Sequence, residues 1–89
     1  MKIEIYGKES CPFCIKAKNA CKSAGIEYID YVIGKDATKQ DVQDRINALG
    51  LDITVQTVPQ IFVDGDTYIG GYNDLVRAYP WAQVYHSSH

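Results

Sequence analysis

The sequence has few cysteines, no long hydrophobic run and only a small excess of charge. Three cysteines in 89 residues are too few, and odd in number, for the disulfide framework of a small secreted domain. No apolar stretch approaches the roughly 20 residues that a membrane-spanning helix requires. A formal net charge of -2 argues against nucleic acid as the main partner. We therefore expect a globular protein that binds neither a membrane nor nucleic acid.

The N-terminal residues do not resemble a targeting segment. Residues 1–7, MKIEIYG, alternate apolar and polar side chains, whereas a signal peptide has a continuous apolar centre. This pattern predicts a cytoplasmic protein. The chain is long enough for one hydrophobic core and too short for two. We expect a single domain over residues 1–89, in which residues 80–89 form a C-terminal tail without a predicted structure.

Apolar residues at alternating or helical spacing predict four strands and three helices. The predicted strands are residues 3–7, 27–33, 60–63 and 67–69. The predicted helices run from Pro12 to Gly25, from Thr38 to Gly50, and through Leu75 and Val76. This order of elements, β-α-β-α-β-β-α, predicts an α/β fold with one four-stranded mixed β-sheet flanked by three helices.

The helix ends carry local signals. Thr38, followed three residues later by Asp41, resembles a capping box. Asn73 or Asp74 is the expected N-cap of the last helix. Pro80 either interrupts or restarts that helix, and the sequence leaves both alternatives open.

Two cysteines, Cys11 and Cys14, enclose Pro12 and Phe13 at the start of the first predicted helix. Pro12 suits the first helical position, which leaves Cys11 at the cap and Cys14 one turn inside. Unpaired backbone N–H groups and the helix dipole stabilise a thiolate at this position, and Lys8 adds a positive charge. We expect a low pKa for Cys11 and deeper burial for Cys14. Cys11 therefore attacks a disulfide and Cys14 resolves the product.

A zinc site is the main alternative for two cysteines at this spacing. A structural zinc ion takes four ligands, and the only other candidates, His86 and His89, lie at the far end of the chain. Their spacing matches no zinc finger, so we predict no metal. Cys21 lies seven residues after Cys14, about 10 Å along a helix axis and too far for a disulfide. We expect Cys21 to be a small core residue.

Two loops of the predicted fold lie near this cysteine pair. The proline of Thr57-Val58-Pro59 comes directly before a strand, where it would forgo a ladder hydrogen bond. Residues 70–74, GGYND, provide unhindered backbone and a helix N-terminus suited to a carboxylate. The topology brings both loops to the sheet edge at which Cys11 lies.

The segments CPFC, TVPQIFVDG and GGYNDL stand in the order and spacing of the glutaredoxin family, and the sequence resembles that family over nearly all of residues 3–79. The resemblance implies a thioredoxin-like fold and a redox-active dithiol of Cys11 and Cys14. It also implies a cis peptide bond before Pro59, and glutathione as a co-substrate with no tightly bound cofactor.

The resemblance further implies a glutathione-binding site. The backbone of Val58 pairs with the glutathione cysteine, and Lys8 and Gln56 approach its glycine carboxylate. The helix N-terminus at Asn73 takes the γ-glutamyl carboxylate and Asp74 takes the amine, although a helix-capping role explains Asp74 equally well. The implied binding residues are Lys8, Phe13, Gln56, Thr57, Val58, Pro59, Gly71, Tyr72, Asn73 and Asp74. Many relatives carry Arg in place of Gln56 and Tyr in place of Phe13.

These observations predict a glutathione-dependent thiol–disulfide oxidoreductase that reduces protein disulfides and protein–glutathione mixed disulfides. The expected partners are glutathione and disulfide-containing proteins, with ribonucleotide reductase as an example taken from the family, and we expect a monomer. Two alternatives stay open. One is a thioredoxin-like electron donor reduced by a flavoprotein reductase, against which residues 70–74 argue. The other is an iron–sulfur cluster carrier, ligated by Cys11 of two chains and two glutathiones, which Pro12 disfavours.

Overall fold

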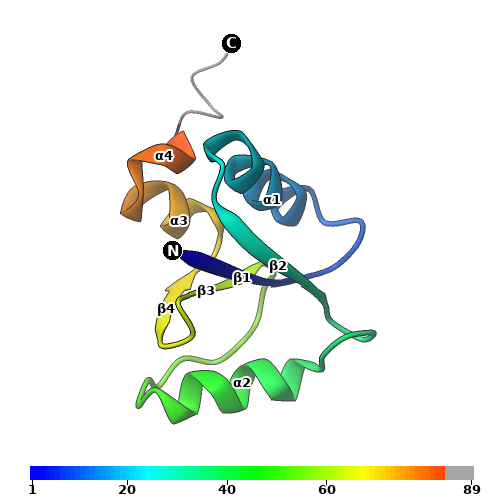
Figure 1. Cartoon of the computed structure of the whole chain (residues 1–89). Coiled ribbons are helices and arrows are strands. Elements are labelled where there is room, and N and C mark those ends of the chain that lie inside the picture. Colours follow the sequence, from blue (N-terminus) through cyan, green and yellow to red (C-terminus); the bar gives the residue numbers. More distant parts are fainter. Residues whose placement is uncertain (84–89) are drawn as a thin grey trace.

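Four strands form one mixed sheet in the order β2-β1-β3-β4 (Figure 1). They are β1 Lys2–Gly7, β2 Glu27–Val32, β3 Gln60–Val63 and β4 Thr67–Gly70. β2 runs parallel to β1, whereas β3 runs antiparallel to β1 and to β4. The computed structural model describes residues 1–83. The predicted four-stranded mixed sheet is confirmed.

Helices cover both faces of the sheet (Figure 1). The helices α1 Pro12–Ala24, α3 Tyr72–Ala78 and α4 Pro80–Gln83 lie on one face, and α2 Lys39–Ala48 lies on the other. Pro80 restarts the helical chain after Tyr79, so the last predicted helix is divided in two. Residues 84–89, which include His86 and His89, lie outside the described residues. None of the described helices is long and apolar enough to cross a membrane.

The start of α2 confirms the predicted capping box of Thr38 and Asp41. The predicted N-cap of α3 was wrong. The N-cap of α3 is Gly71, not Asn73 or Asp74. Gly70 adopts a φ of 114°, a conformation that favours glycine, and the chain therefore turns into the helix earlier than the side-chain signals suggest. A Cβ atom on Gly70 would also lie 2.6 Å from a carboxylate oxygen of Asp74.

Alternating side chains of the strands build two cores, one on each face of the sheet. Ile3, Ile5, Ile61 and Val63 face the cluster that includes Ala17, Cys21 and Leu75 of α1 and α3. Tyr6 and Phe62 face Val42, Ile46 and Val55. This alternation follows from the two-residue period of a strand. The central strands β1 and β3 therefore support helices on both sides.

Arg45 joins α2 to the sheet. Its Nη1 and Nη2 atoms donate to the two carboxylate oxygens of Glu4 at 2.8 and 2.7 Å, and Nη1 also donates to the Tyr6 hydroxyl at 2.9 Å. The guanidinium lies 4.3 Å from the ring centroid of Phe62. The hydrogen bonds from Arg45 hold the pKa of Glu4 below its usual value, against the opposing effect of burial. The pair is mostly buried, with side-chain exposures of 23% and 14%.

We expect Arg45→Ala to lower the free energy of unfolding by about 2 kcal/mol at pH 7, because it leaves the Glu4 carboxylate largely buried and unpaired. The pKa of Glu4 is lowered in the folded state, so its contribution is present above the unfolded pKa and is lost as the pH falls through the folded value. Urea denaturation at pH 7 and near pH 3 measures both effects. The difference between the variant and the wild type should shrink at the lower pH.

Arg77→Ala is the matched control, because Arg77 forms an exposed ion pair with Asp74. This control should cost no more than about 0.5 kcal/mol. A loss for Arg45→Ala equal to that of Arg77→Ala would contradict the proposed link between α2 and the sheet.

Candidate dithiol active site

Cys11 is the N-cap residue of α1, as the sequence predicts. Its backbone is extended, Pro12 follows within the first helical turn, and its Sγ accepts a hydrogen bond from the backbone N–H of Cys14 at 3.4 Å. Cys11 is half-buried, whereas Cys14 is 1% exposed. All three cysteines are free thiols. Within the pair, Cys11 is therefore the accessible sulfur.

The surroundings of Cys11 favour its thiolate. Burial raises the pKa of this thiol, but hydrogen bonds from the side chain and backbone N–H of Cys14 and from the backbone N–H of Phe13 lower it, as does the charge of Lys18. The net effect is a lowered pKa, as predicted. The contributing lysine, however, is Lys18 rather than Lys8. Lys18 lies two turns along α1, where it is held by an ion pair with Asp30, while Lys8 is exposed.

The other two cysteines have the opposite tendency. Burial, together with the hydrogen bond that its S–H donates to Cys11, raises the pKa of Cys14 to about 12. Burial raises the pKa of Cys21 to about 11. Since the thiolate is the nucleophile, Cys11 is the one thiol of the three that is prepared to attack. Cys21 lies in the core, as expected.

Gly7 makes room for Cys14, and sequence reasoning did not identify it. A Cβ atom at Gly7 would lie 2.5 Å from Sγ of Cys14, closer than two such atoms can approach. The available signal was a glycine at the last position of the strand that leads into the motif. The buried thiol therefore depends on a residue with no side chain.

The Val58 carbonyl lies next to the attacking sulfur. The S–H of Cys11 donates to this oxygen at 3.8 Å, although the two residues are 47 positions apart in the chain. The peptide bond between Val58 and Pro59 is cis, as the resemblance implies. The backbone of the Thr57-Val58-Pro59 segment is thus placed beside Cys11.

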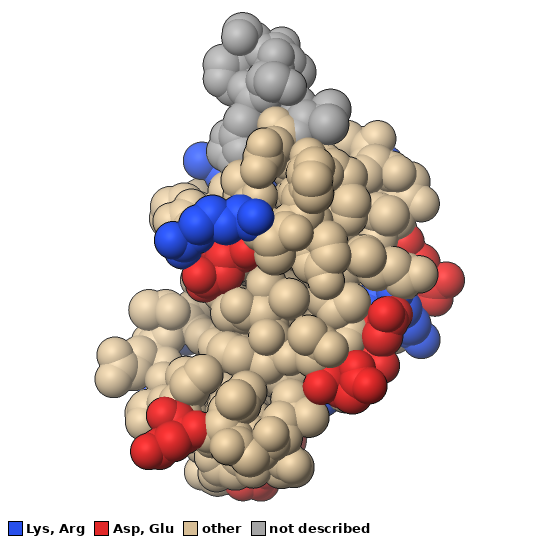
Figure 2. All heavy atoms as spheres, turned by 90° about the vertical axis from the view of Figure 1, so that its left-hand side faces the viewer, with Lys and Arg blue, Asp and Glu red and all other residues tan. Residues whose placement is uncertain are grey.

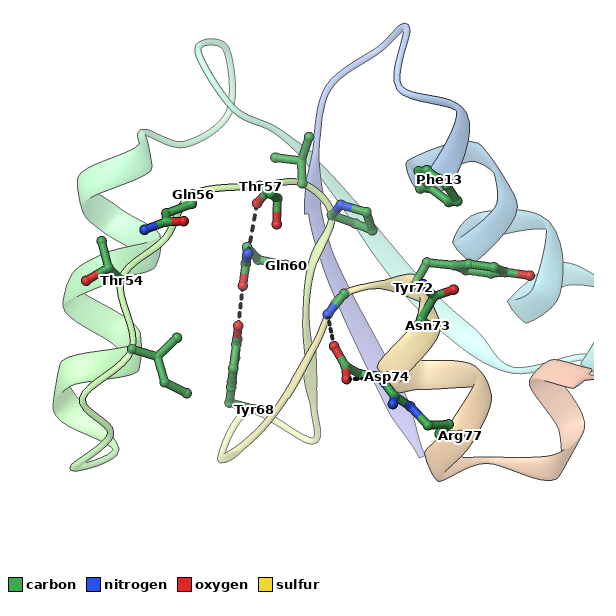
Figure 3. A pocket seen from close by; sticks show the side chains of 14 residues that line it. Phe13, Thr54, Gln56, Thr57, Gln60, Tyr68, Tyr72, Asn73, Asp74 and Arg77 are labelled. Carbon is green, nitrogen blue, oxygen red and sulfur yellow. Dashed lines mark hydrogen bonds and ion pairs between the residues drawn. The ribbon is translucent and has the colours of Figure 1, made fainter.

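A hollow of about 530 Å³ opens beside this segment (Figure 3). We call it the main hollow. Nine of the ten implied binding residues line it, namely Phe13, Gln56, Thr57, Val58, Pro59, Gly71, Tyr72, Asn73 and Asp74. Lys8 lies apart from them, in a smaller hollow of about 170 Å³ that also includes Gln56, Thr57 and Val58. The main hollow has further lining residues that the sequence did not indicate: Ile53, Thr54, Gln60, Tyr68 and Arg77.

Asp74 has two partners within its own helix region. Its Oδ2 accepts from the backbone N–H of Gly71 at 2.9 Å, and its Oδ1 accepts from Nη2 of Arg77 at 2.8 Å. The first bond satisfies a free N–H group at the start of α3. The helix-capping alternative for Asp74 therefore has a structural basis, and a ligand amine at Oδ1 would meet the Arg77 guanidinium.

Charged side chains and potential metal ligands of the described residues are spread out rather than clustered. On the face drawn in Figure 2, the charged side chains of the described residues are scattered and mostly acidic. Within residues 1–83, no group of three or more His, Cys, Asp or Glu side chains could hold a metal ion.

Matches to known proteins point to one family. The glutaredoxin family model matches residues 3–68. The chain is 40% identical to glutaredoxin 3 of Escherichia coli strain K12 over 73 residues, which is 82% of this chain and 80% of that protein. The solution structure of reduced Escherichia coli glutaredoxin superposes with a TM-score of 0.71 at 33% identity, covering 88% of this chain and 92% of that one.

A buckwheat glutaredoxin, solved as a glutathione complex, matches with a TM-score of 0.66 and covers 96% of this chain and 79% of that one. At 19% identity, this match supports the fold alone. The predicted thioredoxin-like fold is confirmed by these similarities. Together with the dithiol at the start of α1, they show that the chain belongs to the glutaredoxin family of thiol–disulfide oxidoreductases.

Proposed function

We propose that the protein is a glutathione-dependent oxidoreductase that reduces protein–glutathione mixed disulfides and protein disulfides. The observation that carries this proposal is the position of the Cys11 sulfur, which has a lowered pKa and lies 3.8 Å from the Val58 carbonyl at the side of the main hollow. A hollow of about 530 Å³ has the size of a small-molecule site. The buckwheat glutaredoxin that shares this fold was solved with glutathione, and the membership of this chain in the same family favours that ligand here.

The proposed reaction begins when the Cys11 thiolate attacks the glutathione sulfur of a mixed disulfide. A Cys11–glutathione disulfide forms, and the protein thiolate leaves. A second glutathione thiolate then attacks the bound glutathione sulfur, which yields oxidised glutathione and restores the Cys11 thiolate. For a protein disulfide, Cys11 first forms a mixed disulfide with the substrate. Cys14 then attacks the Cys11 sulfur, so that the substrate leaves as a dithiol and an internal disulfide remains.

The ligand would lie across both hollows. The backbone of Val58 would pair with the glutathione cysteine, as one strand pairs with another. Lys8 and Gln56 line the smaller hollow and would meet the glycine carboxylate. Asn73 and Asp74 would meet the γ-glutamyl end, where the ligand amine would share Oδ1 of Asp74 with Arg77 or replace it.

This function suits a protein that acts as a monomer in a reducing compartment such as the cytoplasm, where glutathione keeps thiols reduced. Disulfide-containing proteins, ribonucleotide reductase among them, are the proposed substrates. The buried Cys14, whose S–H donates to Cys11, supports internal resolution of the mixed disulfide.

Reduction should depend on glutathione. With glutathione, glutathione reductase and NADPH, we expect steady NADPH oxidation in the presence of a mixed disulfide, because the main hollow suits a tripeptide. The control replaces glutathione and its reductase with thioredoxin reductase. Turnover in the control and none with glutathione would support the thioredoxin-like alternative instead. A brown colour and visible absorption in protein purified without oxygen would support the iron–sulfur alternative.

The three cysteines should respond differently to substitution. Cys11→Ser should abolish both reactions, because a serine hydroxyl stays protonated and forms no mixed disulfide. Cys14→Ser should keep reduction of mixed disulfides at or above the wild-type rate, since glutathione attacks from outside, but lose reduction of protein disulfides. Cys21→Ser is the matched control and should keep both activities, at a cost of about 1 kcal/mol in the free energy of unfolding. Activity in Cys11→Ser would refute these roles.

The alkylation rate of Cys11 should rise with pH and then reach a plateau. The midpoint of this rise should lie below about 8.5, the pKa of an ordinary cysteine. Cys14 and Cys21 should not react at neutral pH, because their pKa values are raised to about 12 and about 11. Lys18→Met should move the midpoint of Cys11 to higher pH, since the Lys18 charge favours the thiolate. Iodoacetamide labelling followed by mass spectrometry measures each thiol. Lys22→Met, at an exposed position of the same helix, is the control and should leave the midpoint unchanged.

A further inference from the structure

A chain of hydrogen bonds runs along the main hollow from Tyr68 to the backbone of Thr57 (Figure 3). The Tyr68 hydroxyl donates to Oε1 of Gln60. The Nε2 of Gln60 donates to the Thr57 carbonyl at 2.8 Å. The Tyr68 side chain of β4 is thereby connected, through Gln60 at the start of β3, to the Thr57-Val58-Pro59 segment beside Cys11.

These two bonds fix the orientation of the Gln60 amide. Gln60 is 4% exposed, so its amide cannot take both of its partners from water. The oxygen accepts from the Tyr68 hydroxyl and the nitrogen donates to the Thr57 carbonyl. A rotation by 180° would place the amide oxygen against that carbonyl, which can only accept. Tyr68 itself is held by its ring, whose centroid lies 5.3 Å from that of buried Phe62. The hydroxyl is therefore presented to Gln60 by a packed side chain.

The held segment has no regular secondary structure. Residues 51–59 lie outside the helices and strands, so their backbone groups depend on side chains and loops for partners. On the α2 side, Gln43 donates to the Ile53 carbonyl at 2.8 Å and accepts from the Val55 N–H at 2.9 Å. On the side nearer the thiol, Gln60 holds Thr57. Two glutamine amides thus hold this wall of the main hollow at its two ends.

We propose that Tyr68, acting through Gln60, is a positioning residue that orients the Thr57–Val58 backbone for pairing with bound glutathione. This inference rests on the proposed function. Val58 is one residue beyond the held carbonyl, and its own carbonyl lies 3.8 Å from Sγ of Cys11. A peptide ligand can pair with this backbone only if the N–H and C=O groups of the protein segment point in one fixed direction. A small disulfide that contacts only the Cys11 sulfur does not depend on the direction of these groups.

Removal of the Tyr68 hydroxyl leaves Oε1 of Gln60 buried without its donor. The amide then gains by turning or by moving toward water, and the Thr57 carbonyl loses its fixed partner. The cost falls on binding of the peptide part of the substrate, not on the thiol. We expect the KM for a glutathione-containing disulfide to rise about ten-fold, with kcat within about two-fold of the wild type.

The test compares Tyr68→Phe with Tyr28→Phe, a change of the same kind on β2, the strand at the opposite edge of the sheet. The first substrate is the mixed disulfide of cysteine and glutathione, assayed with glutathione, its reductase and NADPH. The second is hydroxyethyl disulfide with dithiothreitol as the reductant, a reaction without any peptide. Tyr68→Phe should raise the KM in the first assay alone, and Tyr28→Phe should match the wild type in both.

Gln60→Glu provides a second variant. Its ionised carboxylate accepts from Tyr68 but cannot donate to Thr57, so the KM of the first assay should be raised at pH 8. The KM should fall toward the wild-type value as the pH is lowered and the carboxyl gains a proton that it can donate. A merely structural role of Gln60 predicts no such recovery, because loss of folding would lower the activity in both assays at every pH.

The outcomes separate the two proposals. An active wild type with an unchanged KM in Tyr68→Phe would overturn the positioning role and leave the proposed function standing. An equal loss of activity of Tyr68→Phe in both assays would also overturn the positioning role, since such a loss would show general damage to the fold or the thiol. A wild type that reduces hydroxyethyl disulfide but not the glutathione substrate would overturn the proposed function, and the positioning role with it.

Discussion

The position of the Cys11 sulfur at the N-terminus of α1 is the constraint on which the rest of the site depends. The backbone N–H of Cys14 needs an acceptor at the helix start, and the sulfur supplies it at 3.4 Å. The same contact lowers the pKa of Cys11. The helix is therefore stabilised by the atom that it makes reactive, and a change that shifts the cap would alter folding and reactivity together.

The central place of β1 decides what faces this sulfur. β3 lies antiparallel beside β1 and begins at Gln60, opposite Tyr6. Residues that come just before β3 therefore arrive at the end of β1, where α1 begins. This explains how Val58 meets Cys11 across 47 positions of the chain. On the other face, Arg45 secures α2 to the sheet, and Gln43 of that helix in turn holds residues 53–55.

Features with local signals could be predicted from the sequence. The cap at Cys11 and the capping box of Thr38 and Asp41 depend on residues within one helical turn, and both are confirmed. The predicted N-cap of α3 was wrong, because the backbone conformation of Gly70 and its close approach to Asp74 outweigh the side-chain preference. The choice between Lys8 and Lys18 depends on which charge the folded chain brings near the sulfur, and spacing in the sequence carries no such information.

The contact between Gln60 and Tyr68 could not be predicted from the sequence. Both residues fit the alternation of a strand, which identifies the face on which a side chain lies but not its partner. The pairing of β3 with β4 shifts register between Ile61 and Phe62, and such an irregularity re-aims side chains near a site. Alternation alone therefore could not place the Tyr68 hydroxyl on the Gln60 amide.

This arrangement divides the site into two parts with different physical origins. The reactivity of Cys11 comes from a helix terminus and from Cys14, whose burial in turn requires the absence of a side chain at Gly7. The wall of the main hollow comes from an irregular segment held by glutamine side chains. Substitutions in residues 51–57 can alter which ligand fits without touching the thiols, whereas a side chain at Gly7 would push against Cys14 directly. Ligand selectivity is thus the more adaptable property of this fold, and the dithiol is the more constrained one.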